Sequence, residues 1–282
     1  MGGGSAGKHG KEKVAISIDA GLLKRVDARV DGTNVKSRSH AMELLLMKAL
    51  GGGSETRALV LCGGEKRGLT PSTYHLPRAL VEVGGKPILQ RTIEWLKANG
   101  VKHIVLAIGQ SGEEIAAYFK NGEAFGVEID FVRESKPLGT AGAVKNAEEK
   151  MNGTFVVLNG DVLCDFDLRA MLEAHRKSGA LATMALKSVR DEGRYGVAET
   201  EGEKIVKFEE KAKQKGESRL VNAGVYVLSE RIFDSLPGQG MLERDVFPSL
   251  ARKGLMRGYV FSGKWVDLGD RASLQRAEKE LG

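Results

Sequence analysis

Residues 57–64 read RALVLCGG, a short apolar run that ends on two glycines. Three further apolar runs follow it, and helix-like segments stand between them. The runs cover 58–61, 103–108, 127–132 and 154–158, and the helix-like segments cover 87–99, 113–120 and 140–150. Continuous apolar strands that alternate with helices are typical of a parallel sheet that is covered on both faces. We therefore expect an α/β fold with a mostly parallel sheet and helices on both faces.

Polar and glycine-rich residues follow these runs. In such sheets ligands bind beyond the carboxyl ends of the strands, so these residues are the candidates for function. Gly63-Gly64 follows the first run, LGTAGA (138–143) the third and Asn159-Gly160-Asp161 the fourth, and WVDLG (265–269) lies far downstream. Paired glycines let a backbone approach phosphate closely, although a tight turn also explains them. A carboxylate that ends a buried strand beside a glycine suits Mg²⁺.

The composition is that of an ordinary globular protein, with 41% hydrophobic and 28% charged residues among 282. No apolar run approaches the roughly 18 residues of a membrane span. Residues 1–10 are polar and carry no apolar segment, so we expect no secretory signal. Cys62 and Cys164 sit in or beside apolar runs, which favours buried thiols in a reducing cytoplasm. We therefore expect a cytoplasmic protein without a membrane partner.

The chain divides at a Gly-rich linker, residues 51–56, that follows a segment of different charge. Residues 1–50 hold nine basic and five acidic side chains, so most of the net charge of +6 lies there. This is a weak indication of an anionic partner, and a solvated basic surface explains it as well. We expect a flexible N-terminus over 1–10, a small module over 11–50 and a large domain over 57–282.

The small module has the pattern of one strand and two helices. Residues 13–18, KVAISI, alternate strictly, which predicts a half-buried strand. Asp19 is placed to cap a helix that runs to about residue 30, and Ser37 or Ser39 to begin a second. About 40 residues bury too little surface to fold alone, and a lone strand leaves its edge open. Two copies that pair their strands solve both problems, so we expect a homodimer or a higher oligomer.

The module 11–50 resembles the ribbon-helix-helix (β-α-α) family of dimeric DNA-binding proteins over its whole length. In that family a two-stranded ribbon enters the major groove of double-stranded DNA. The resemblance implies that Lys13 and Ser17 face bases, and that Ser37, Arg38 and Ser39 bind phosphate at the start of the second helix. The alternative is a module that only dimerises.

Residues 57–282 resemble the sugar-1-phosphate nucleotidyltransferases, also called sugar-nucleotide pyrophosphorylases, whose fold is Rossmann-like. Eight pieces of sequence carry the resemblance in series: LVLCGG, PRALVEVGGKPIL, PLGTAGA, LNGD, RYGV, FEEK, LVNAGVYVL and WVDLG. The family transfers a nucleotidyl group from an NTP to a sugar 1-phosphate and releases pyrophosphate. PLGTAGA with LVNAGVYVL is most similar to members that use glucose- or mannose-type hexose 1-phosphates.

The resemblance assigns roles to individual residues. Asp161 and Asp267 would hold Mg²⁺, and Arg67, Arg78 and Lys211 would complete the catalytic set. The implied nucleotide-binding residues are Leu61, Gly63, Gly64, Glu134, Gly139, Thr140 and Gly160. The implied sugar-phosphate-binding residues are Gly196, Glu210, Lys211 and Asn222.

The glycine-rich loop departs from the family pattern, which reads GGxGTRLxPLT where this chain has GGEKRGLTPST (63–73). Lys66 replaces the third glycine, and Gly68 stands at the position of the catalytic arginine. Arg67, one residue earlier, could reach the triphosphate with Lys66, and Gly68 would give the loop freedom for this. Alternatively, the loss of the arginine removes transition-state stabilisation. An active enzyme with a dimerising DNA-binding arm and a transcription regulator that senses sugar nucleotides or sugar phosphates with a degenerate domain therefore both remain open.

Overall fold

The chain forms two compact units, Met1–Gly53 and Ser54–Gly282. The computed structural model describes residues 14, 16–30, 32, 35, 37–49, 56–63, 68–109, 112–190, 193–210 and 218–281. Among the described residues, no helix combines the length and the hydrophobicity that crossing a bilayer requires.

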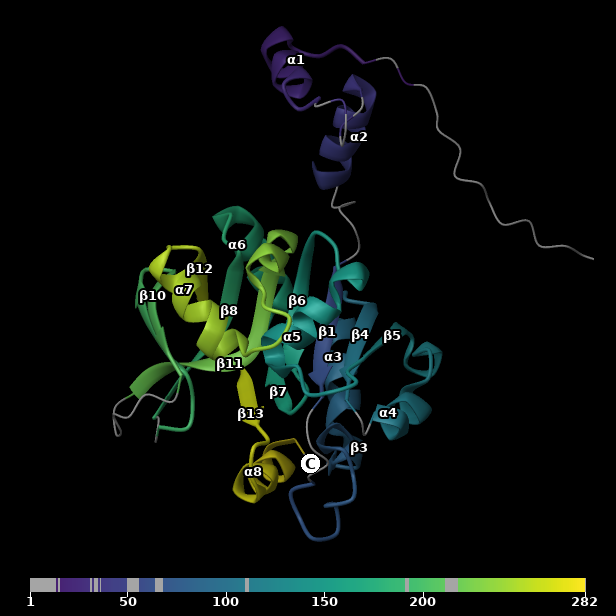
Figure 1. Cartoon of the computed structure of the whole chain (residues 1–282), viewed down its shortest axis with the longest axis vertical. Coiled ribbons are helices and arrows are strands. Elements are labelled where there is room, and N and C mark those ends of the chain that lie inside the picture. The colour runs from purple at the N-terminus through teal and green to yellow at the C-terminus, as the bar shows by residue number, and fades with distance from the viewer. Residues whose placement is uncertain are drawn as a thin grey trace, which may run out of the picture. The chain divides into compact units, whose positions relative to one another are not determined.

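The large unit is built on a nine-stranded sheet with the order β5-β4-β1-β6-β11-β8-β12-β10-β9 (Figure 1). Its strands are β1 (Arg57–Cys62), β4 (His103–Ile108), β5 (Glu128–Arg133), β6 (Thr154–Asn159), β8 (Ala182–Arg190), β9 (Val197–Glu201), β10 (Lys204–Glu209), β11 (Ser218–Ser229) and β12 (Met256–Val260). Two short ribbons join β7 (Val162–Asp165) to β13 (Lys264–Asp267) and β2 (Glu82–Val83) to β3 (Lys86–Pro87). The α/β expectation and the first four strands are confirmed.

The sheet is mixed and not parallel throughout. β5, β4, β1 and β6 pair in parallel, as the apolar runs predict. β11 then pairs antiparallel with both β6 and β8. The prediction of a mostly parallel sheet therefore fits the half that holds the first four strands, whereas the other half contains antiparallel pairs. The twelve-residue β11 lies between the two halves of the sheet, and some of its side chains line the mouth of the sheet.

Helices cover both faces of the sheet (Figure 1). The large unit contains α3 (Ile88–Ala98), α4 (Gly112–Phe119), α5 (Gly139–Asn146), α6 (Leu168–Ser178), α7 (Phe247–Arg252) and α8 (Arg271–Leu281). Its short helical turns are η1 (Arg78–Leu80), η2 (Glu123–Phe125), η3 (Glu148–Lys150), η4 (Glu230–Ser235) and the π-helical η5 (Leu242–Val246). The segment predicted as one helix over 140–150 is thus α5 followed by the separate turn η3.

Alternate residues of each central strand enter opposite cores, because successive side chains of a strand point to opposite faces. Leu59 of β1 packs in the core that contains residues of α5 and α7. Val60 packs in the core that contains residues of α3, α4 and α6. Both side chains are fully buried, and full burial of a side chain of this size stabilises the fold by roughly 1.5–3 kcal/mol. The two cores hold the sheet rigidly, so its carboxyl edge is a fixed platform.

The N-terminal unit contains α1 (Ala20–Asp27) and α2 (Arg38–Ala49). Asp19 caps α1 through the backbone N–H groups of Gly21 and Leu22, as predicted. The Ser37 hydroxyl accepts a hydrogen bond from His40 N, so α2 begins at Arg38.

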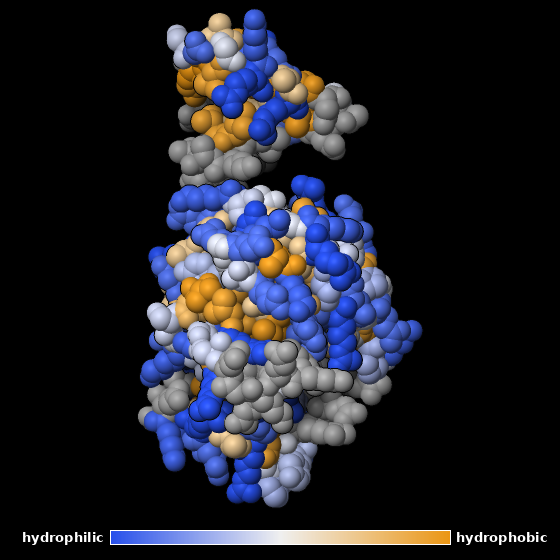
Figure 2. Space-filling view, turned by 90° about the vertical axis from the view of Figure 1, so that its left-hand side faces the viewer, coloured by the Kyte–Doolittle hydropathy of each residue, from blue (hydrophilic) through white to orange (hydrophobic). Residues whose placement is uncertain are grey.

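No strand forms at residues 14 and 16–19 of this unit, in contrast to the prediction for 13–18. Backbone ladder bonds need a neighbouring strand, and a single chain offers no second copy of this segment. Val14 and Ile16 are exposed, and Figure 2 shows further hydrophobic surface on the unit, whose exposed side chains include Leu22 and Leu46. The ribbon and the dimer stay predictions, and Lys13 lies outside the described residues.

His175 joins α6 to the sheet inside the large unit. Its imidazole is 2% exposed, and its Nδ1 and Nε2 lie 2.8 Å from Thr183 Oγ1 and 2.9 Å from Ser229 Oγ. Burial, aided by the charge of Arg176, lowers the pKa of His175 from 6.5 to about 4. The folded state therefore holds a neutral imidazole under conditions that protonate the unfolded chain.

This burial predicts a loss of stability in acid. Between pH 6.5 and pH 4 the unfolded chain binds a proton at His175 that the folded chain does not, so the free energy of unfolding falls as the pH falls. The contribution is at most about 3 kcal/mol, from about 1.4 kcal/mol for each pKa unit. Urea unfolding of the wild type and of His175→Gln across this range measures it. Equal slopes in both proteins would contradict the prediction.

Candidate active site

A cleft of about 710 Å³ opens at the carboxyl edge of the sheet. Its walls come from the ends of β1 and β6, from α5, and from the later strands β11 and β13. Of the predicted site residues, the lining includes Leu61, Gly63, Arg78, Thr140, Gly160, Asp161, Gly196, Glu210, Asn222 and Asp267. Gly64, Arg67 and Lys211 lie outside the described residues. The cleft thus brings together residues that the sequence separates widely.

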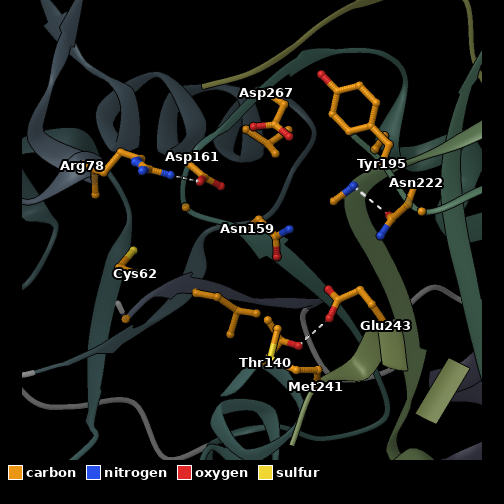
Figure 3. A pocket seen from close by; sticks show the side chains of 18 of the residues that line it. Cys62, Arg78, Thr140, Asn159, Asp161, Tyr195, Asn222, Met241, Glu243 and Asp267 are labelled. Carbon is orange, nitrogen blue, oxygen red and sulfur yellow. Dashed lines mark hydrogen bonds and ion pairs between the residues drawn. The ribbon is translucent and has the colours of Figure 1, made fainter. Parts of the chain in front are cut away.

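The two candidate metal ligands, Asp161 and Asp267, meet because β7 pairs with β13. Asp267 lies opposite Val162 in this ribbon, and Leu268 N donates to Asp161 O at 2.9 Å. Figure 3 shows both carboxylates on one side of the cleft. Burial first, and then the charge of Asp161, raises the pKa of Asp267 to about 6. A cation between the two carboxylates would offset both effects.

Arg78 balances part of this negative charge. It begins η1, and its Nη1 donates to Asp161 Oδ2 at 2.9 Å (Figure 3). Among the described residues, no group of three or more His, Cys, Asp or Glu side chains could enclose a metal ion. Two carboxylates at the wall of an open cleft nevertheless fit Mg²⁺, which uses one or two carboxylates together with substrate oxygens and water.

A close backbone contact places Asp161. Gly160 N donates to Leu61 O at 3.0 Å, and a Cβ on Gly160 would stand 2.7 Å from the same oxygen. Only glycine lets the chain leave β6 this close to β1. Asp161 follows directly and turns into the cleft, so the Gly-Asp pair has a steric cause as well as a chemical one.

Glu134 lies at the nucleotide side, next to the first glycine of the loop. A Cβ on Gly63 would be 3.3 Å from Glu134 Oε1, and Leu138 N donates to Glu134 Oε2 at 3.3 Å. Burial raises the pKa of this carboxyl group. Glu134 is not among the lining residues of the cleft, and Gly139, which begins α5, is not among them either. Glu134 therefore packs directly behind Gly63, and its contact with a nucleotide stays a prediction.

The predicted sugar-phosphate residues form a second cluster. Asn222 N donates to Gly196 O at 2.8 Å, and a Cβ on Gly196 would stand 2.7 Å from Glu210 Oε2. Tyr195 and Trp265 close this side as an edge-on pair, with ring centroids 5.1 Å apart. An aromatic wall beside amide and carboxylate groups is suited to a sugar, which offers both hydroxyl groups and apolar ring faces.

Several lining residues were given no individual role in the sequence analysis, although some lie in motifs that it quoted. They are Asn159, Arg194, Tyr195, Glu243, Arg244 and Trp265, among others. Asn159 stands in the middle of the cleft (Figure 3), and its buried Oδ1 has no hydrogen-bond partner among the described residues. It is the first residue of the NGD triplet, so its position was visible in the sequence although its role was not. Glu243 belongs to η5 and lies outside every motif that the sequence analysis recognised.

Gly68 was expected to give the glycine-rich loop conformational freedom, but the structure shows a tightly packed position. It is buried, and a Cβ there would stand 1.8 Å from Thr73 O. That carbonyl is fixed, since it accepts from Leu76 N at 2.9 Å. In this chain the position therefore has no room for an arginine. Lys66 lies outside the described residues, so the reach of the loop to a triphosphate stays a prediction.

Arg38, a predicted phosphate ligand, holds the N-terminal unit together. Its Nε and Nη2 donate to the two carboxylate oxygens of Asp27, at 2.6 and 2.8 Å. This bidentate pair links α2 to α1. Ser17 and Ser39 are exposed. Contacts of these residues with DNA stay predictions.

The comparisons agree with this geometry. The family model described as Nucleotidyl transferase matches residues 57–282. The chain belongs to this family. The mannose-1-phosphate guanyltransferase of Yarrowia lipolytica is 38% identical over 220 residues, which are 76% of this chain and 60% of that protein. The mannose-1-phosphate guanylyltransferase of Mycobacterium tuberculosis is 35% identical over 231 residues, 79% of this chain and 64% of that one. The chain thus spans about 60% of the length of these curated relatives.

Two solved proteins share the fold of the chain. HddC from Yersinia pseudotuberculosis has a TM-score of 0.71 at 26% identity, covering 80% of this chain and all of that one. HddC is also known in complex with GMP-PN. A putative glucose-1-phosphate thymidylyltransferase from Bacillus anthracis has a TM-score of 0.72 at 28% identity, covering 80% and 94% of the two chains.

The packing of Gly68 predicts that restoring the family arginine harms this protein. Gly68→Arg and Gly68→Ala push a side chain into the Thr73 carbonyl and should lower the free energy of unfolding by about 1–3 kcal/mol. Gly238→Ala is the matched control, because a Cβ there meets nothing within 4 Å. Chemical denaturation measures all three variants. Wild-type stability in Gly68→Arg would show that the loop accepts the arginine after all.

Proposed function

We propose that the large unit transfers a guanylyl group from GTP to mannose 1-phosphate, forming GDP-mannose and pyrophosphate. The observation that carries the proposal is the ribbon of β7 and β13, which brings Asp161, directly before β7, beside Asp267 in a cleft that glycine, amide, carboxylate and aromatic residues line. The similarity to mannose-1-phosphate guanylyltransferases supports the choice of sugar and base.

In the proposed reaction a phosphate oxygen of mannose 1-phosphate attacks the α-phosphorus of GTP. The bond from the α-phosphorus to the bridging oxygen breaks, and pyrophosphate leaves with the electron pair. Such a reaction depends mostly on positioning and on cationic stabilisation. Mg²⁺ bound by Asp161 and Asp267 would neutralise phosphate oxygens.

The chain supplies the remaining contacts. Arg78 donates one hydrogen bond to Asp161, and its guanidinium has further N–H groups that can bind phosphate oxygens. Arg67 and Lys211 are proposed to add positive charge at the triphosphate and at the sugar phosphate. Glu210, Gly196 and Asn222 would orient the sugar hydroxyls. Gly63 and Thr140 line the nucleotide side.

Turnover is tested with purified protein, Mg²⁺, each NTP and a panel of hexose 1-phosphates, with pyrophosphate release as the readout. We expect turnover with GTP and mannose 1-phosphate, and a loss of at least 100-fold in kcat for Asp161→Asn and Asp267→Asn, which remove the proposed metal ligands. Asp165→Asn, an exposed carboxylate of the same ribbon, is the control.

The same assay examines the regulator alternative, in which the large unit senses sugar nucleotides or sugar phosphates and the N-terminal module binds DNA. Tight binding of GDP-mannose by calorimetry without turnover of any pair would favour a sensor. The N-terminal DNA-binding and dimerising arm remains a prediction of the sequence.

The choice of base depends on Glu134 in this proposal. A carboxylate offers two acceptors, and guanine presents two adjacent donors, N1–H and N2–H, whereas adenine has no such pair. Glu134→Gln replaces one acceptor with a donor and should lower the ratio of kcat/KM for GTP to that for ATP by about tenfold, the equivalent of about 1.4 kcal/mol. Steady-state kinetics with both nucleotides measures the ratio. An unchanged ratio would remove Glu134 from base recognition.

A further inference from the structure

A line of hydrogen bonds connects the nucleotide side of the cleft to the sugar side. Thr140 Oγ1 donates to Glu243 Oε2 at 2.7 Å, and Tyr226 OH donates to Glu243 Oε1 at 3.1 Å. Asn222 Nδ2 donates to the Tyr226 oxygen at 2.8 Å. Thr140 and Asn222 line opposite parts of the cleft, with Glu243 between them (Figure 3). Neither Glu243 nor Tyr226 belongs to the binding set assigned above.

The line has a fixed direction. Both carboxylate oxygens of Glu243 accept, so the Tyr226 hydroxyl points its proton at Glu243 and its oxygen must accept from Asn222. The other end of the Asn222 amide agrees, because Gly224 N donates to Asn222 Oδ1 at 2.9 Å. The orientation of the amide is therefore determined from both sides. Its second N–H group is the one left to bind a ligand.

Burial prevents water from replacing these bonds. Tyr226 is fully buried, with its ring 4.9 Å from that of Phe247, and Glu243 is 7% exposed. Burial, together with the charge of Glu243, raises the pKa of Tyr226 far above its usual value, so the phenol stays a donor. A buried donor or acceptor that loses its partner has no solvent to turn to.

The hydroxyl of Thr140 has its proton and one lone pair bound within the protein. It donates to Glu243 and also accepts from Leu242 N at 2.8 Å. Its proton is thus not available to a ligand, and the bonds to Glu243 and Leu242 anchor the start of α5 to η5.

We propose that Glu243 is a positioning residue that orients both halves of the site. Through Tyr226 it fixes Asn222 as a hydrogen-bond donor to an oxygen of the sugar 1-phosphate. Through Thr140 it holds the start of α5 against the nucleotide. The inference rests on the proposed function for the identity of the two ligands.

Three variants separate the two arms of the line, which run from Glu243 through Tyr226 to Asn222 and from Glu243 to Thr140. Tyr226→Phe keeps the ring and cuts the arm to Asn222. Thr140→Val keeps the shape and cuts the arm to the nucleotide side, and Thr140→Ser, which retains the hydroxyl, is its control. Glu243→Leu removes both carboxylate oxygens and therefore cuts the contact to Tyr226 and the contact to Thr140 together.

Steady-state kinetics with GTP, mannose 1-phosphate and Mg²⁺ gives the first readout. We expect Tyr226→Phe to raise KM for mannose 1-phosphate about tenfold and to leave KM for GTP within twofold. Thr140→Val should show the opposite pattern, Thr140→Ser a smaller rise in KM for GTP than Thr140→Val, and Glu243→Leu a rise in both KM values. Equal losses for the two substrates in every variant, or lower kcat with both KM values unchanged, would indicate a merely structural role and overturn the proposal.

Nuclear magnetic resonance of the free protein gives a readout that needs no turnover. The side-chain amide signals of Asn222, identified by their loss in Asn222→Asp, should shift in Tyr226→Phe and Glu243→Leu and stay in place in Thr140→Val. Signals that do not move in either of the first two variants would refute the line of hydrogen bonds. If the wild type turns over no substrate pair, the proposed function fails while these spectra still decide the arrangement.

Discussion

The pairing of β7 with β13 is the constraint on which the rest of the candidate site depends. Both strands are four residues long, and neither belongs to the main sheet. Their ladder brings an aspartate from the middle of the chain beside one from near its end. Behind the ribbon, a small apolar cluster of Leu163, Val266, Leu274 and other residues packs α8 against it. The last helix thus supports the carboxylates from outside the cleft.

Much of the architecture followed from the sequence, because the signals were local. The apolar runs of β1, β4, β5 and β6 reflect burial on both faces, and the cap of α1 needs only Asp19 and the two N–H groups that follow it. Gly160 and Asp161 were found through a short motif at the end of a strand, whereas Asn222 came from the resemblance to the nucleotidyltransferases. Each of these features depends on residues that are near neighbours in the chain.

The missed features depend on contacts between distant segments. The antiparallel insertion of β11 between β6 and β8 is a matter of pairing, which strand periodicity does not encode. Glu243 lies in a π-helical turn without a motif, and it gains its partners only when η5 meets α5 and β11. The role of Gly68 likewise depends on where the carbonyl of Thr73 falls. The strand predicted at 13–18 needs a second chain, and one sequence cannot show whether it is present.

The unpaired oxygen of Asn159 has a thermodynamic consequence for the ligand-free protein. A buried acceptor without a donor costs roughly 1–3 kcal/mol. A ligand hydroxyl that donates a hydrogen bond to this oxygen, once the Asn159 side chain has rotated, would remove that cost. Part of the binding free energy would then come from satisfying a buried acceptor of the protein. Because the free energy of the ligand-free protein is raised in this way, a ligand can bind more tightly without burying a larger surface.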